Sequence, residues 1–130
     1  MDIVTLHLSH SFPLMISGIE VAIKKTDNVV LLGASSDIQE AMHMCLVQKP
    51  KLLLVDRELL GVKIHSLLRY FNNILPNMSV LIFVQNLYEL VLYETPCLCV
   101  SGYLLNSVSE ENLIQAIGTV ANGGVWHNRL

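Results

Sequence analysis

The chain has 130 residues, the length of one domain and enough to bury a sizeable core. Charged residues make up only 15% and hydrophobic residues 52%, whereas soluble domains carry about 25% charged residues. This composition indicates several elements buried on both sides, or an apolar face that meets a partner. The net charge of −3 gives no electrostatic basis for nucleic-acid binding by this domain.

The N-terminal stretch does not have the pattern of a targeting segment. Asp2, His7 and His10 interrupt its apolar residues, so it does not resemble a signal peptide. No run reaches the roughly 18 apolar residues that a membrane span requires. The three cysteines are odd in number and lack metal-ligand spacing. We therefore expect a cytoplasmic protein with reduced thiols and no membrane contact.

Short apolar runs alternate with segments of helical spacing from the N-terminus onward. A strand is predicted at Ile3–Ser9 because the run is rich in aliphatic and β-branched residues. A helix over Leu14–Lys25 follows a proline and ends on two lysines, which suit the negative end of the helix dipole. A second strand is predicted at Val29–Leu32. Ser36, with Gln39 three residues later, matches a capping box and predicts the start of the next helix.

The stretch from Lys49 to Gly61, KPKLLLVDRELLG, organises the rest of the chain. Lys49-Pro50 ends the preceding helix near Gln48, because a proline disfavours the helical region for the residue before it. Leu52–Val55 is too short for a helix and apolar enough for a strand buried on both faces. The run ends on Asp56, and open α/β sheets place functional groups at this end of their strands.

The second half of the chain continues the alternation. A helix is predicted at Val62–Asn73, a strand at Val80–Val84, a short helix at Leu87–Glu94 and a strand at Val100–Leu105. A last helix starts from a cap at Ser107 or Ser109 and ends at a pair of glycines. Five strands alternating with five helices predict one α/β domain with a parallel sheet and helices on both faces.

A series of motifs accompanies this alternation over nearly the whole chain. They are Pro13-Leu14 with Gly18, Lys49-Pro50 with LLLVD and Gly61, Ser101–Leu105, and Ser109–Leu113 leading to Ala116-Ile117. In this order and spacing they resemble the receiver domain of a LuxR/NarL-type two-component response regulator. The resemblance implies the flavodoxin-like (CheY-like) fold, a three-layer sandwich around a five-stranded parallel sheet of order 2-1-3-4-5.

The tail, AIGTVANGGVWHNRL, is similar to the end of the family's receiver domain, just before a linker and a helix-turn-helix. We therefore expect residues 1–130 to form a single receiver-like domain, with a DNA-binding domain following in the full gene. Any contact with DNA would be made by that domain and not by this chain.

Two positions match the functional residues of the family. Asp56 falls on the phospho-acceptor position, and Tyr103 falls on the switch aromatic of the last strand. The resemblance implies that these two residues would carry phosphorylation and its readout.

The other pocket positions depart from the family's pattern. The two acids that follow the first strand and hold magnesium are replaced by His10 and Ser11. The hydroxyl at the end of the fourth strand is replaced by Val84, and the lysine after the fifth strand by Asn106. Leu60 occupies the position of the usual proline after the acceptor.

These departures remove the groups that phosphoryl transfer to a carboxylate requires. Magnesium binds mainly through carboxylates and water, and one Asp with a His and a Ser is a poor magnesium site. The loss of a single donor from such a site typically costs roughly 3 to 4 kcal/mol of transition-state stabilisation. We therefore expect weak or absent Mg²⁺ binding, no other cofactor, and no efficient magnesium-dependent phosphorylation.

Other uses of the pocket stay open. His10 and Asp56 would lie at adjacent strand ends, where the pair could sense pH or bind a transition metal with Glu58 nearby. His10 could also neutralise Asp56. The chain has no glycine-rich phosphate loop and no nucleophile elbow, so we do not expect an enzyme.

The stretch from Leu87 to Glu94 is apolar nearly all round. Its side chains cannot all point into one core from a two-turn helix, so it either packs irregularly under the last helix or forms a protein–protein surface. The resemblance implies an output face on the fourth helix, fifth strand and fifth helix, where Tyr103 also lies, and homodimers through the first and last helices. The candidate surface residues are Leu87, Tyr88, Leu90, Val91 and Tyr93.

The favoured hypothesis is an atypical receiver domain that acts as a regulatory and dimerisation module of a transcription regulator. It would form a homodimer and respond to a histidine kinase or another regulatory protein. One alternative is a conventional response regulator that accepts phosphate at Asp56. Another is a stand-alone ligand-sensing adaptor.

Overall fold

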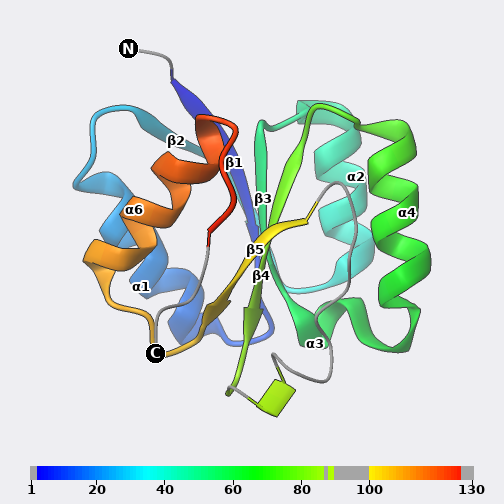
Figure 1. Ribbon diagram of the computed structural model, residues 1–130. Coiled ribbons are helices and arrows are strands. Elements are labelled where there is room, and N and C mark those ends of the chain that lie inside the picture. Colours follow the sequence, from blue (N-terminus) through cyan, green and yellow to red (C-terminus); the bar gives the residue numbers. More distant parts are fainter. Residues whose placement is uncertain (1–2, 87, 90–99, 127–130) are drawn as a thin grey trace.

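Five parallel strands form the centre of the molecule in the order β2-β1-β3-β4-β5 (Figure 1). The computed structural model describes residues 3–86, 88–89 and 100–126. Each neighbouring pair of strands is parallel, which confirms the predicted sheet and its order. The strands are β1 (Val4–Ser9), β2 (Val29–Ser35), β3 (Leu52–Asp56), β4 (Ser79–Val84) and β5 (Val100–Leu105).

Helices cover both faces of this sheet and complete the predicted three-layer sandwich. Figure 1 shows α1 (Pro13–Lys24) and α6 (Glu110–Ala121) on one face. The other face carries α2 (Ile38–Gln48), α3 (Arg57–Leu60) and α4 (Ile64–Ile74). In the part of the chain that the structure describes, no helix has the length and apolar character needed to cross a membrane.

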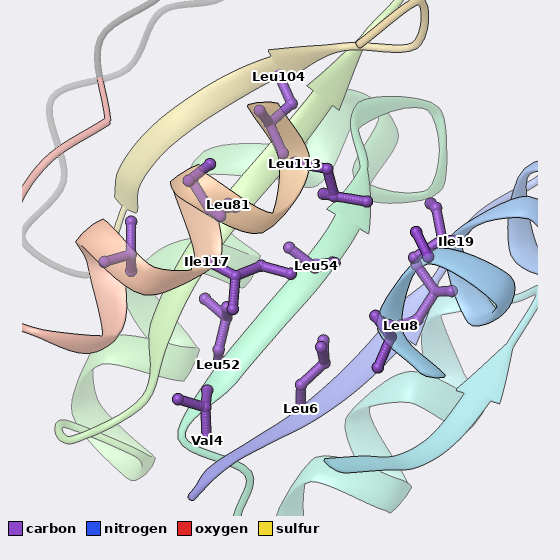
Figure 2. Close-up of a cluster of buried hydrophobic side chains, with 14 of the residues drawn as sticks. Val4, Leu6, Leu8, Ile19, Leu52, Leu54, Leu81, Leu104, Leu113 and Ile117 are labelled. Atoms are coloured by element: carbon purple, nitrogen blue, oxygen red, sulfur yellow. The ribbon is translucent and has the colours of Figure 1, made fainter. Parts of the chain in front are cut away.

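The strands are held between two apolar clusters, one on each face. Residues 52 and 54 of β3 belong to the cluster under α1 and α6, and residues 53 and 55 belong to the cluster under α2 and α4. All five residues of β3 are buried, as predicted for a strand covered on both sides. Figure 2 shows the first cluster, whose labelled side chains are Val4, Leu6, Leu8, Ile19, Leu52, Leu54, Leu81, Leu104, Leu113 and Ile117.

Two helix starts differ from or refine the sequence prediction. The predicted cap of α2 at Ser36 was wrong, because Asp37 is the N-cap and its carboxylate accepts the backbone N–H of Glu40 at 2.8 Å. A charged oxygen one residue later satisfies the same free N–H groups. At α6 the two candidate caps resolve to Ser109, whose hydroxyl accepts from the backbone N–H of Asn112 at 3.1 Å.

Two element boundaries also differ. β2 continues to Ser35 rather than ending at Leu32, because its small last residues pair with β1. The helix predicted from Val62 begins at Ile64, after the short α3 and a 3₁₀ turn over Gly61–Lys63. Of the helix predicted over Leu87–Glu94, only Tyr88 and Glu89 are described, and both are helical. The remaining residues of that prediction lie outside the described part.

A histidine is buried within β1. His7 is fully buried, and its Nε2 lies 2.8 Å from the Ser35 hydroxyl oxygen. Burial lowers the pKa of His7 below its usual 6.5, because removal from water disfavours the charged imidazolium. The folded protein therefore holds His7 neutral under conditions in which an unfolded chain begins to protonate it.

This burial predicts a pH dependence of stability. Below about pH 6.5 the unfolded state binds a proton at His7 more readily than the folded state, so the free energy of unfolding falls as the pH falls. We expect His7→Gln to remove this component. Urea denaturation of both proteins at pH values from 8 to 5 measures it: the difference in unfolding free energy between wild type and variant should shrink on acidification. A constant difference would contradict the prediction.

Candidate functional site

Asp56 ends β3 at the C-terminal edge of the sheet, and its carboxylate is fully buried. Oδ2 accepts hydrogen bonds from the Ser11 hydroxyl and from the Ser11 backbone N–H, the latter at 3.3 Å. Oδ1 accepts the backbone N–H of Glu58 at 3.2 Å, so Asp56 is also the N-cap of α3. Both oxygens of the predicted acceptor therefore bind groups of the chain itself.

His10 is fully buried beside Asp56, and its hydrogen bonds define a neutral tautomer. The backbone N–H of Phe12 donates to Nδ1 at 3.1 Å, so Nδ1 carries a lone pair and no proton. Nε2 then carries the proton and donates it to Oδ1 of Asn106 at 3.1 Å. Nδ1 lies 3.6 Å from Oδ2 of Asp56, which is beyond hydrogen-bond length. His10 thus pairs with Asn106 rather than with the carboxylate.

The His10–Asn106 bond joins the loop after β1 to the loop after β5. The backbone N–H of His10 donates to the carbonyl of Ser35 at 3.1 Å, and that of Asn106 donates to the carbonyl of Val84 at 2.9 Å. The His10 ring meets Phe83 edge-on, with ring centroids 5.5 Å apart. Four of the predicted pocket positions, 10, 11, 56 and 106, therefore come together. Val84 contributes a backbone carbonyl and a buried apolar side chain.

An ion pair that the sequence analysis missed joins the segment after β3 to the segment after β4. Arg57 Nε donates to Oε2 of Glu89 at 3.1 Å, and the two side chains are only 16% and 10% exposed. Oε1 of the same carboxylate accepts the backbone N–H of Gln85 at 3.0 Å. The segment after β3 is thus tied to the segment after β4. Glu89 is the single charged residue between positions 87 and 93. A lone charge in an apolar stretch is the sequence signal that could have indicated a paired carboxylate.

The groups around Asp56 differ from the oxygen-rich set that Mg²⁺ prefers. Mg²⁺ prefers several oxygen ligands in octahedral geometry, but the groups next to Asp56 are a neutral imidazole and a hydroxyl that already donates to the carboxylate. The side chain of Glu58 is 46% exposed and lies 3.4 Å from Arg57. Within residues 3–86, 88–89 and 100–126, no group of three or more His, Cys, Asp or Glu side chains could hold a metal ion.

Two tyrosines of the predicted output face, Tyr103 and Tyr88, differ in exposure. Tyr103, on β5, is only 6% exposed and belongs to the apolar cluster under α2 and α4. Tyr88 is 71% exposed. The other predicted surface positions, Leu87, Leu90, Val91 and Tyr93, lie outside the described residues.

The outer face of α1 is uncharged and exposes two large apolar side chains, which the sequence analysis did not single out. Leu14 and Val21 are 87% and 53% exposed. Ser17 and Gly18, between them, are also exposed. These four positions have the i, i+3, i+4, i+7 spacing of one helix face and carry no charge. We call Leu14, Ser17, Gly18 and Val21 the α1 stripe.

Solved structures of receiver domains share this fold. The isolated receiver domain of RcsB from Salmonella enterica serovar Typhimurium, in the presence of the phosphomimetic BeF₃⁻, superposes with a TM-score of 0.79 at 17% identity and covers 96% of this chain and 93% of its own. The receiver domain of the putative regulator NarL from Mycobacterium tuberculosis gives a TM-score of 0.74 at 18% identity over 95% of this chain and 99% of its own.

A two-component response regulator of the LuxR family from Aurantimonas sp. SI85-9A1 also superposes, with a TM-score of 0.77 at 20% identity, covering 95% of this chain and 89% of its own. The fold is therefore that of the receiver domains of response regulators. At these identities the likeness establishes the fold alone.

A curated relative agrees with this fold. The transcriptional regulatory protein MctR of Rhizobium johnstonii is 23% identical over 119 residues, which cover 92% of this chain and 56% of MctR. The chain thus spans little more than half the length of the curated relative that it matches. No family model matches the sequence.

The contacts of Asp56 predict that Ser11 supports the fold. Ser11→Ala removes a hydroxyl donor from a buried carboxylate, and we expect it to lower the unfolding free energy by about 1 to 3 kcal/mol. The matched control is Ser66→Ala in α4, because Ser66 is exposed on a helix and alanine favours helices. Chemical denaturation measures both variants. Equal effects of the two substitutions would show that the Ser11 hydroxyl does not stabilise the carboxylate.

Proposed function

We propose that this chain is an atypical receiver domain that works as a regulatory and dimerisation module. In this proposal protein contacts, and not magnesium-dependent phosphorylation of Asp56, set its output. The carrying observation is that the Asp56 carboxylate is fully buried and accepts hydrogen bonds from the chain on both oxygens.

The energetics of phosphoryl transfer support this proposal. To react, Asp56 would have to give up the hydrogen bond from Ser11 and meet a negatively charged donor. Its neighbours His10 and Asn106 are neutral and bonded to each other, so neither supplies the positive charge that transfer needs. Loss of one such stabilising group typically costs roughly 3 to 4 kcal/mol, and several are replaced here.

The α1 stripe supports the second part of the proposal, a homodimer. Exposed apolar residues gathered on one face mark interaction surfaces. RcsB, which shares the fold, has been solved as two dimers bound to two parallel DNAs, with a TM-score of 0.83 at 17% identity. MctR is named a transcriptional regulatory protein. We propose that this chain likewise serves a transcription regulator. In this proposal a part of the protein outside this chain contacts DNA. A histidine kinase or another regulatory protein is the candidate partner of the chain itself.

Phosphorylation is tested by intact mass after incubation with acetyl phosphate and magnesium. We expect no added phosphate on the wild type, because the pocket lacks cationic groups. Asp56→Ala is the control for phosphate bound elsewhere. A gain of one phosphate that disappears in Asp56→Ala would overturn the proposal and would favour a conventional phospho-accepting regulator.

Dimerisation through the α1 stripe is tested by analytical ultracentrifugation. Leu14→Lys replaces the most exposed apolar side chain of the proposed contact with a charged one, so we expect the dimer to weaken by at least about tenfold. Val62→Lys is the matched control, because Val62 is 99% exposed on the opposite face of the sheet. Equal dimerisation of wild type and both variants would exclude the α1 stripe as the contact.

A further inference from the structure

Two buried polar atoms point to the same place beneath α2. Nδ1 of His7 and Oε1 of Gln48 are the buried side-chain nitrogen and oxygen atoms that have no hydrogen-bond partner among the described residues. A Cβ atom on Gly33 would lie 3.5 Å from that Nδ1 and 3.6 Å from that Oε1. Buried polar atoms are normally hydrogen-bonded, so two such atoms beside one glycine indicate a shared ligand.

The sheet register and a bulge create this place. His7 on β1 lies opposite Gly33 on β2, after a register shift that leaves Leu32 without a partner residue on β1. Nε2 of Gln48, the last residue of α2, donates to the carbonyl of Leu32 at 3.3 Å. Because its amide nitrogen is used there, the amide oxygen is the atom that faces Gly33 and His7.

The neighbouring hydrogen bonds define which atoms need a donor. The Ser35 hydroxyl donates to the Ser9 hydroxyl oxygen at 3.0 Å, so Nε2 of His7 is the donor to Ser35. Nδ1 of His7 then carries a lone pair. Nδ1 and the Gln48 oxygen are both acceptors, so the ligand must be small, uncharged and able to donate two hydrogen bonds. A bare cation is disfavoured because two neutral ligands do not repay its desolvation.

We infer that one buried water molecule binds here and donates one hydrogen to Nδ1 of His7 and the other to Oε1 of Gln48. Buried waters typically form hydrogen bonds with buried polar groups that have no partner in the chain. This water joins the end of α2 to β1 and extends the hydrogen-bonded chain of His7, Ser35 and Ser9. The backbone carbonyl of Ser35 accepts the N–H of His10, so the chain reaches the loop that holds the candidate site.

The first test is direct observation of the water. Nitrogen-15 NMR of the His7 ring should show a protonated Nε2 and an unprotonated Nδ1, and a water cross-peak should appear at the ring. A high-resolution crystal structure should place a water within hydrogen-bond distance of both acceptors. A direct hydrogen bond between the Gln48 amide and Nδ1, or a protonated Nδ1, would overturn the inference.

Gly33→Ala tests the site by displacement. The new methyl group would lie 3.5 Å from Nδ1 and 3.6 Å from Oε1 and would crowd a water that binds both atoms, so we expect the cross-peak to disappear and the unfolding equilibrium constant to rise by about tenfold. Gly118→Ala in α6 is the control, because a Cβ there meets nothing within 4 Å and alanine favours the helix. It should keep the cross-peak and stabilise the protein. A cross-peak that persists in Gly33→Ala would contradict the site.

A second pair of variants avoids the methyl group of Met44, which lies 2.9 Å from the new Cβ position on residue 33. Gln48→Met and His7→Phe each remove one acceptor. If a water bridges the two residues, their effects on the unfolding equilibrium constant are coupled by about three- to tenfold in a double-mutant cycle. Additive effects would overturn the bridge.

Discussion

The hydrogen bonds that the Asp56 carboxylate accepts hold the C-terminal edge of this sheet together. Burial of a carboxylate without hydrogen-bond partners costs a large amount of free energy. The loop that carries Ser11 and the start of α3 must therefore both remain in contact with Asp56. This one requirement fixes how the loop after β1 and the segment after β3 sit on the sheet. The bond between His10 and Asn106 adds the loop after β5 to the same group.

The ion pair of Arg57 and Glu89 extends this closure to the segment after β4. A largely buried ion pair gains little net stability over an apolar pair of similar size, but the loss of one partner leaves an uncompensated charge. Here the carboxylate also accepts the backbone N–H of Gln85, so the pair fixes the course of the chain that leads to exposed Tyr88. The segments after β3 and β4 are thus held in place by side chains of the protein itself.

The architecture could be predicted from the sequence because its signals are local. Apolar runs such as Leu52–Val55, bounded by Lys49-Pro50 and Asp56, define a strand without knowledge of its neighbours. The second half of β2 could not be predicted in this way. Gly33, Ala34 and Ser35 have little strand preference and are extended because β1 pairs with them.

The members of the candidate site could be predicted, but their pairing could not. Parallel strands bring their C-terminal ends to one edge, so His10, Asp56 and Asn106 were expected to be neighbours. Which of them hydrogen-bond depends on loop geometry. The N–H of Phe12 occupies the His10 nitrogen nearest Asp56 and turns the other nitrogen toward Asn106. Arg57 and Glu89 are 32 positions apart, and no local pattern links them.

An aspartate at position 56 has a structural reason to be there that is independent of phosphate. Its Oδ1 caps α3, and its Oδ2 anchors the loop after β1. A carboxylate near a helix N-terminus is also favoured by the helix dipole. Loss of function on replacing Asp56 would therefore follow from the loss of these contacts as readily as from the loss of a phosphorylation site. Only a measurement of covalently bound phosphate separates the two roles of this carboxylate.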